Sequence, residues 1–199
     1  MSCGTAIEGL DRKDAQAALV KRIADIATRA VPGDEGVHLR FINNDAVCNN
    51  LSAAQVEAKL QFSPGGGTAL GANLTKKVLQ PLVYDVIEKG EPLARPLLVL
   101  TITDGCPNSG DDFLGAIKEC SRRLGEKGYK KTAVRFDLSQ IGNDPDASKF
   151  LQGLLQDEEI QDVLHCTAEH LDAKFAELRA NERDIEKWLL DKLKKPINY

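Results

Sequence analysis

The 199-residue sequence lacks any long hydrophobic run, at its start or elsewhere. No stretch approaches the roughly 18 apolar residues that a membrane-spanning helix needs. A secretory signal peptide requires an apolar core near the first residue, whereas residues 1–15 carry the charged side chains Glu8, Asp11, Arg12, Lys13 and Asp14. We therefore expect a cytoplasmic protein that does not bind membranes.

The sequence also lacks a surplus of basic residues. Its formal net charge is −4, and the Lys and Arg residues are scattered along the chain, which argues against nucleic-acid binding. Lys192, Lys194 and Lys195 form a short basic run near the C-terminus of a predicted helix. Cations are favourable there because they oppose the helix dipole, so we interpret this run as a solvated helix end.

The cysteines show neither a CxxC pair nor the spacing of zinc ligands. Their number is odd, and the five are Cys3, Cys48, Cys106, Cys120 and Cys166. Neither a disulfide framework nor a structural zinc site is indicated, and cytoplasmic thiols normally stay reduced. We predict five free thiols.

What is present is typical of a globular protein, with 42% hydrophobic and 28% charged residues. The length fits one domain covering residues 1–199. Within it we expect an irregular N-terminus over residues 1–10 and a helical C-terminal segment over residues 171–193. Asn181 could cap a second helix inside this segment.

Helical and strand patterns alternate along the chain. Helices are predicted over residues 11–30, 52–60, 68–88, 111–125 and 146–155, and strands over 37–42, 97–103, 132–138 and 161–166. This alternation predicts an α/β fold with a doubly wound, Rossmann-like and mainly parallel sheet that has helices on both faces. Residues 97–103 are nearly all apolar, which predicts the central strand. Pro81 predicts a kink or break in its helix.

Polar residues follow the predicted strands, and such residues meet at one edge of a parallel sheet, where ligands bind. Asp104 lies in the turn Thr103-Asp104-Gly105, directly after the predicted strand 97–103. A glycine-rich turn precedes the predicted helix over residues 68–88. Besides Asp104, this predicted ligand-binding edge collects Asn43, Asn44, Asp45, Gly66, Gly67, Cys106 and Ser139.

The glycine-rich turn Gly65–Gly71 and the Thr-Asp-Gly turn at residues 103–105 together resemble the von Willebrand factor A domain, especially its small cytosolic single-domain members of fungi. In that family a threonine hydroxyl of the first turn and the aspartate of the second serve a metal-ion-dependent adhesion site. The resemblance implies that Thr68 and Asp104 are metal ligands. Considered alone, Thr68 could equally cap its helix, and Asp104 could bond the amides of its own turn.

The family's DxSxS motif, which ends its central first strand, has no counterpart before the first predicted helix. Mg²⁺ prefers six oxygen ligands in octahedral geometry, so we expect weak Mg²⁺ binding or none. The missing strand would lie between the strands that match residues 37–42 and 97–103. Either these two strands pair directly in a monomer, which we favour, or a strand from a second molecule fills the gap in an exchanged dimer.

The resemblance implies a non-enzymatic protein–protein interaction module that captures an acidic side chain of its partner through the bound ion. No nucleophile–base pair is evident in the sequence, which agrees with a non-enzymatic role. Two alternatives remain open. One is a metal-assisted hydrolase that uses Asp104, Asn43, Asn44 and Asp45 around an ion, and the other is a structural or storage protein.

Overall fold

The computed structural model describes residues 12–30, 35–60, 66–93, 95–167, 170–178 and 181–196. Its main sheet consists of three parallel strands, β3 (Leu97–Thr103), β4 (Val134–Gln140) and β5 (Leu164–Thr167), in the order β3-β4-β5. The parallel register is regular along the whole of β3 and β4. The α/β class and the parallel sheet predicted from the sequence are therefore confirmed. The predicted irregular segment over residues 1–10 lies outside the described residues.

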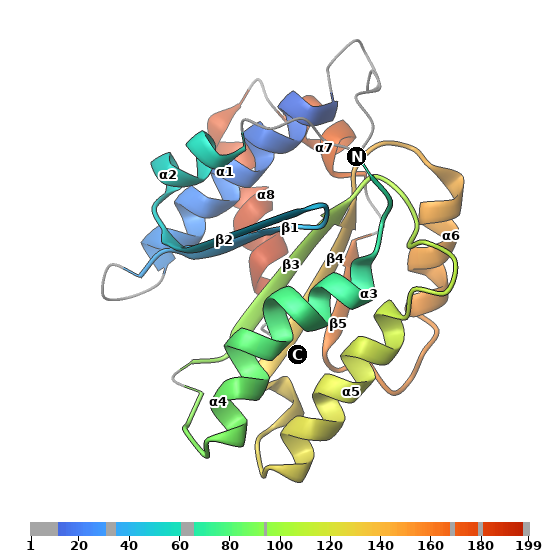
Figure 1. The fold of residues 1–199 in the computed structure, drawn as a ribbon. Helices are drawn as coiled ribbons and strands as arrows, with labels where there is room; N and C mark the ends of the chain where they lie inside the picture. The colour runs from blue at the N-terminus through green and yellow to red at the C-terminus, as the bar shows by residue number, and fades with distance from the viewer. Residues whose placement is uncertain are drawn as a thin grey trace.

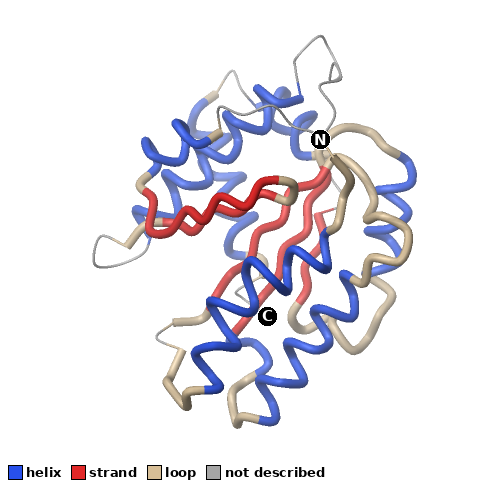
Figure 2. Tube along the Cα trace, viewed as in Figure 1, coloured by secondary structure: helices blue, strands red, loops and turns tan. Residues whose placement is uncertain are grey.

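Helices cover both faces of this sheet (Figures 1 and 2). The first face packs against α3 (Leu70–Asn73), η2 (Leu74–Tyr84), α4 (Asp85–Glu88) and α5 (Phe113–Glu126). The second face packs against α1 (Arg12–Ala30), α7 (Leu171–Leu178) and α8 (Glu182–Lys194), and Leu100 and Ile102 of β3 point to this side. α6 (Pro145–Leu154) follows β4 and completes the first cluster. No helix of the described residues is long and apolar enough to cross a membrane.

Local capping signals in the sequence produce the expected helix boundaries. Ser52 caps α2 (Ala53–Lys59) in a reciprocal arrangement with Gln55, whose side chain accepts from the Ser52 amide. Asn181 separates α7 from α8, and its side chain accepts from the amide of Arg183. The predicted division of the C-terminal segment into two helices is confirmed.

Of the kink or break predicted at Pro81, the break does not occur. The chain stays helical from α3 through η2 to α4, and η2 has the wide π-type turn, in which the Asp85 amide donates to the Gln80 carbonyl five residues earlier. Proline disrupts an α-helix because it lacks an amide hydrogen and its ring crowds the preceding turn. The wider π turn changes which carbonyl faces the proline ring, so the helix continues through this position.

The first predicted strand does not join the parallel sheet. β1 (Val37–Phe41) instead pairs in an antiparallel hairpin with β2 (Asn44–Leu51), which the sequence analysis missed. β2 replaces the predicted polar loop at Asn44 and Asp45. The hairpin packs on α1 and α2 through a third apolar cluster that includes Cys48, Leu51 and Val56.

β3 is not the central strand that its apolar sequence predicted. Among the described residues it lies at the edge of its sheet, and β1 is not paired with it. The favoured direct pairing of these two strands is therefore wrong. The hairpin is attached to the rest of the molecule by side chains, because Lys77 of η2 donates to the carbonyls of Phe41, Ile42 and Asn44. These hydrogen bonds fix the hairpin to η2 without pairing it to a strand of the main sheet.

Candidate functional site

The two motif loops are joined by a reciprocal pair of hydrogen bonds between Thr68 and Asn108. The amide of Thr68 donates to the side-chain oxygen of Asn108 at 2.8 Å, and the amide of Asn108 donates to the Thr68 carbonyl at 2.9 Å. Within the second loop, the Thr103 hydroxyl donates to the Gly105 carbonyl at 2.9 Å. The glycine-rich turn and the loop after β3 therefore form one unit at the carboxyl edge of the sheet.

Two asparagine side chains hold the glycine-rich turn from either side. Asn43, at the tip of the hairpin, donates to the Gly67 carbonyl at 2.8 Å. A Cβ atom on Gly66 would lie 2.9 Å from the Asn43 side chain, and one on Gly67 would lie 2.7 Å from that of Asn108. Gly66 also has a φ of +88°, which side chains disfavour. The backbone conformation favours glycine at position 66, and Asn43, Gly66 and Gly67 lie together in the structure.

The Thr68 hydroxyl lies beside the turn that carries Asp104. The position of a Cβ atom on Gly105 is 3.9 Å from Thr68 Oγ1 and 3.8 Å from Asp144 Oδ2. Thr68 and Asp104 are half-buried, and Asp104 interacts with neighbouring groups. Hydroxyl and carboxylate oxygens suit a hard cation such as Mg²⁺. The donors are few, since no group of three or more His, Cys, Asp or Glu residues gathers within the described ranges.

Asp144 and Asn108 were not predicted as site residues. The first oxygen of Asp144 caps α6 by accepting from the Asp146 and Ala147 amides, which leaves the second oxygen towards Gly105. An aspartate followed by proline at the start of a helix signals this cap in the sequence. Asn108 shows no comparable local signal, because its partner Thr68 is 40 residues away.

Asn44 and Asp45 serve the hairpin instead of the predicted edge cluster. The Asn44 side chain accepts from the Ala46 amide. Asp45 is exposed and lies 3.1 Å from Lys77, and the hydrogen bond and charge of Lys77 lower the pKa of Asp45. The hydrolase alternative required both residues beside Asp104, and these contacts give each of them a local structural role.

Ser139 is buried below the edge instead of lining it. Lys192 of α8 reaches between β4 and β5, and its Nζ donates to Asp137 Oδ1 at 2.7 Å, to Ser139 Oγ at 2.6 Å and to Thr167 Oγ1 at 2.6 Å. His165 Nδ1 lies 2.8 Å from the second oxygen of Asp137. These five residues form a buried polar network, and only 4% of Lys192 and 1% of Asp137 are exposed. The interpretation of Lys192 as part of a solvated helix end is wrong.

Burial and charge act on the network in opposite directions. Burial disfavours the Asp137 carboxylate, but the hydrogen bond from His165 and the charge and hydrogen bond of Lys192 outweigh it, so the pKa of Asp137 is lowered. Burial also lowers the pKa of Lys192, against the attraction of Asp137. A hydrogen-bonded pair of this kind is stable in the interior only while both charges are present.

Cys106 is half-exposed in the loop after β3, whereas Cys48, Cys120 and Cys166 are buried, and all four are free thiols. Burial raises the pKa of Cys120 and of Cys166 to about 12. A thiol reacts as its thiolate, so the two buried groups should be nearly inert in the folded chain.

We therefore expect a thiol reagent at pH 8 to modify Cys106 well before Cys120 and Cys166, and to count five thiols after denaturation. Mass spectrometry of peptides from partly modified protein measures the order of reaction. A count below five without reductant would contradict the prediction of free thiols.

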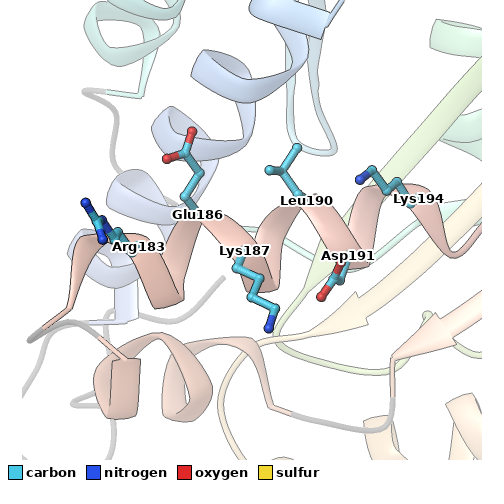
Figure 3. Close-up of a pocket in the computed structure, with 6 residues that line it drawn as sticks. All are labelled: Arg183, Glu186, Lys187, Leu190, Asp191 and Lys194. Carbon is cyan, nitrogen blue, oxygen red and sulfur yellow. The ribbon is translucent and has the colours of Figure 1, made fainter.

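A shallow hollow lies along α8 (Figure 3). The residues that line it all belong to this one helix, and they are Arg183, Glu186, Lys187, Leu190, Asp191 and Lys194. Glu186 pairs with Arg29 of α1 at 2.6 Å. Charges of both signs on the exposed face of a helix are typical of a solvated face, and this hollow contains none of the motif residues.

Comparisons with protein-family models, with curated proteins and with solved structures gave no match to this chain.

Proposed function

We propose that this chain is a non-enzymatic protein-binding module of the von Willebrand factor A type. Its binding surface is the carboxyl edge of the sheet, where the glycine-rich turn meets the loop after β3. The observation that carries the proposal is the reciprocal contact between Thr68 and Asn108, because it holds the threonine and the Thr-Asp-Gly turn of the motif pair at one place. A rigid polar edge of this kind suits recognition of a partner's polar side chain.

In this proposal Thr68 and Asp104 hold a Mg²⁺ ion weakly, and an acidic side chain of the partner completes the coordination. Asp144 offers a further carboxylate oxygen near Gly105. With so few protein ligands the ion keeps most of its water molecules. Partner and ion then bind together, because each supplies part of the site of the other.

Calorimetric titration tests the ion. We expect Mg²⁺ to bind with a dissociation constant on the order of millimolar or weaker, since two or three protein oxygens replace only part of its hydration shell. Asp104→Ala should abolish the measurable heat. Asp162→Ala is the matched control, because Asp162 is an exposed carboxylate next to the opposite, amino end of β5, and it should leave binding unchanged.

Capture from the native lysate tests the partner. The wild-type chain, the Asp104→Ala variant and the Asp162→Ala control are immobilised at equal density, and bound proteins are quantified with and without Mg²⁺. A true partner is retained by the wild type and the control, is lost with Asp104→Ala, and is reduced without Mg²⁺. The proposal fails if no captured protein depends on Asp104.

A further inference from the structure

The tip of the hairpin β1–β2 contacts both the glycine-rich turn and η2. Ile42 and Asn43 form this tip, between the two strands. The side-chain amide of Asn43 donates to the Gly67 carbonyl at 2.8 Å. Lys77 Nζ of η2 donates to the carbonyls of Phe41 and Ile42, both at 2.9 Å. The tip therefore bridges the glycine-rich turn and the helical segment that follows it (Figure 1).

Oxygen atoms surround the Lys77 ammonium. In addition to those two carbonyls, Nζ donates to the Asn44 carbonyl at 3.2 Å and lies 3.1 Å from Asp45 Oδ1. An ammonium has three donors, which match the three carbonyls. Only 10% of the Lys77 side chain is exposed. Lys77 is therefore mostly shielded from water, where hydrogen bonds from a charged group are stronger than on an exposed surface.

Apolar contacts hold the body of the hairpin independently of Lys77. The strands pack on α1 and α2 through the third cluster, which includes Cys48 and Leu51, and Ile42 packs against the first cluster. These contacts keep the hairpin on the molecule when Lys77 is replaced. Hydrophobic contacts are not directional, however, so they do not fix the orientation of the polar Asn43 side chain. The backbone of the tip, which Lys77 holds, determines where Asn43 points.

The contact of Asn43 reaches Thr68 through one peptide group. The Gly67 carbonyl and the Thr68 amide belong to the same peptide group, which is planar. Asn43 donates to the carbonyl of this group, and Asn108 accepts from its amide. The two asparagines therefore hold one peptide plane at both of its polar groups. Because the Thr68 Cα atom lies in this plane, the plane determines where the Thr68 hydroxyl can lie.

We propose that Lys77 is a positioning residue for the candidate binding edge. By holding the hairpin tip it fixes Asn43, and Asn43 in turn fixes the peptide group that leads to Thr68. Without Lys77 the tip moves, and the Thr68 hydroxyl is no longer held beside the Thr-Asp-Gly turn. This role rests on the proposed function only for what Thr68 binds, because the contacts from Lys77 to Thr68 are the same whatever the ligand is.

Hydrogen exchange of the full chain, followed by NMR, tests the contacts themselves. In Lys77→Ala the amides of Thr68 and Asn108 should exchange at least about tenfold faster, as expected for the loss of hydrogen bonds to a charged group. The Phe136 amide of β4, which bonds to the Val163 carbonyl, reports general stability and should change less. Lys76→Ala removes the same charge from an exposed neighbour and should change none of the three. Equal acceleration of all three amides in Lys77→Ala, or no acceleration, would overturn the proposal.

A second variant acts at the other end of the same tip. Asn43 is exposed, so Asn43→Ala should fold normally and accelerate exchange at Thr68 as Lys77→Ala does. Residues that act through one contact are not additive, so the double variant should exchange no faster than Lys77→Ala alone. Additive effects of the two substitutions would show that Lys77 does not act through Asn43.

Chemical rescue tests the ammonium. Propylammonium chloride supplies the three carbon atoms and the ammonium that Lys77→Ala lacks, and it should restore slow exchange at Thr68. Sodium chloride at the same concentration should not. Equal restoration by both salts, or by neither, would overturn the assignment to the Lys77 ammonium.

Titration with Mn²⁺, which prefers oxygen ligands as Mg²⁺ does, connects Lys77 to the proposed metal site. Water-proton relaxation measures weak binding of this paramagnetic ion. Lys77→Ala should weaken binding at least about fivefold, within the range of coupling through contact networks, and Lys76→Ala should not. If wild type binds no Mn²⁺, the proposed ion is wrong, while the exchange rates still decide the role of Lys77. If Mn²⁺ binding depends on Asp104 but neither binding nor exchange responds to Lys77→Ala, only the role of Lys77 is wrong.

Discussion

Replacing Lys192 with methionine is expected to lower the free energy of unfolding by about 3–5 kcal/mol, because the change leaves the buried Asp137 carboxylate without its cation. Ser139 and Thr167 also lose the donor that both now share. Chemical denaturation at pH 7 measures the effect. Lys194→Met is the matched control on the same helix, since Lys194 is exposed, and surface changes of this kind usually stay within about 0.5 kcal/mol.

A double variant shows whether the loss comes from the unpaired charge. Asp137→Asn combined with Lys192→Met removes both charges, so most of the stability lost in Lys192→Met should return. The difference between the double variant and the sum of the single variants gives the coupling of the pair. Purely additive losses would contradict the interpretation of Lys192 and Asp137 as one charged pair.

The same pair sets a pH dependence with a definite sign. Because the pKa of Asp137 is lowered in the folded chain, its carboxylate stabilises the fold fully above the pKa of an unfolded aspartate, about 3.9. That contribution is lost as the pH falls through the lower, folded pKa. Wild type should therefore lose stability in this acid range more steeply than Asp137→Asn.

Local signals in the sequence were sufficient for the order of the elements. Ser52 and Asn181 cap helices through contacts with residues two or three positions away, and such contacts depend on the nearby sequence alone. β2 gave no such signal. Only Cys48 and Leu51 of its eight residues are buried, so the strand lacks the alternation that identifies a half-buried strand.

Long-range contacts explain what the sequence analysis missed at the site. A lysine near a helix end is usually solvated, and nothing near Lys192 in the sequence indicates that Asp137, 55 residues away, will receive it. Ser139 is another case, because its position after a strand is compatible with an exposed edge or with a buried network. Asn43, Gly66 and Gly67, which were all assigned to the ligand-binding edge, do lie together in the structure.

The apolar composition of β3 indicated a central strand, and among the described residues the structure places it at an edge of the sheet. The composition of β3 therefore suits a strand with neighbours on both sides better than a strand that pairs only with β4. Adding a strand beside β3 tests this difference between its composition and its position.

Fusing an apolar strand that ends in Asp-x-Ser-x-Ser to the N-terminus is expected to raise both the stability and the Mg²⁺ affinity. The strand would pair with the side of β3 away from β4, which no described strand occupies, and in parallel orientation its last residues would reach the edge that carries Thr68 and Asp104. A ligand of the folded state stabilises it by mass action, by about 2.7 kcal/mol at a Mg²⁺ concentration 100 times the dissociation constant. Calorimetry and thermal unfolding with and without Mg²⁺ measure the two effects.

A second fusion, identical but ending in Ala-x-Ala-x-Ala, separates pairing from metal binding. Pairing with β3 alone should raise the unfolding temperature of both fusions without Mg²⁺, because it adds the same backbone hydrogen bonds to β3 in each. Only the Asp-x-Ser-x-Ser fusion should gain a further increase with Mg²⁺, since only it adds a carboxylate and two hydroxyls to the site. If the unextended chain already binds Mg²⁺ tightly and Asp104→Ala abolishes this binding, then its own residues suffice for the metal site and the added motif has no ligands to supply.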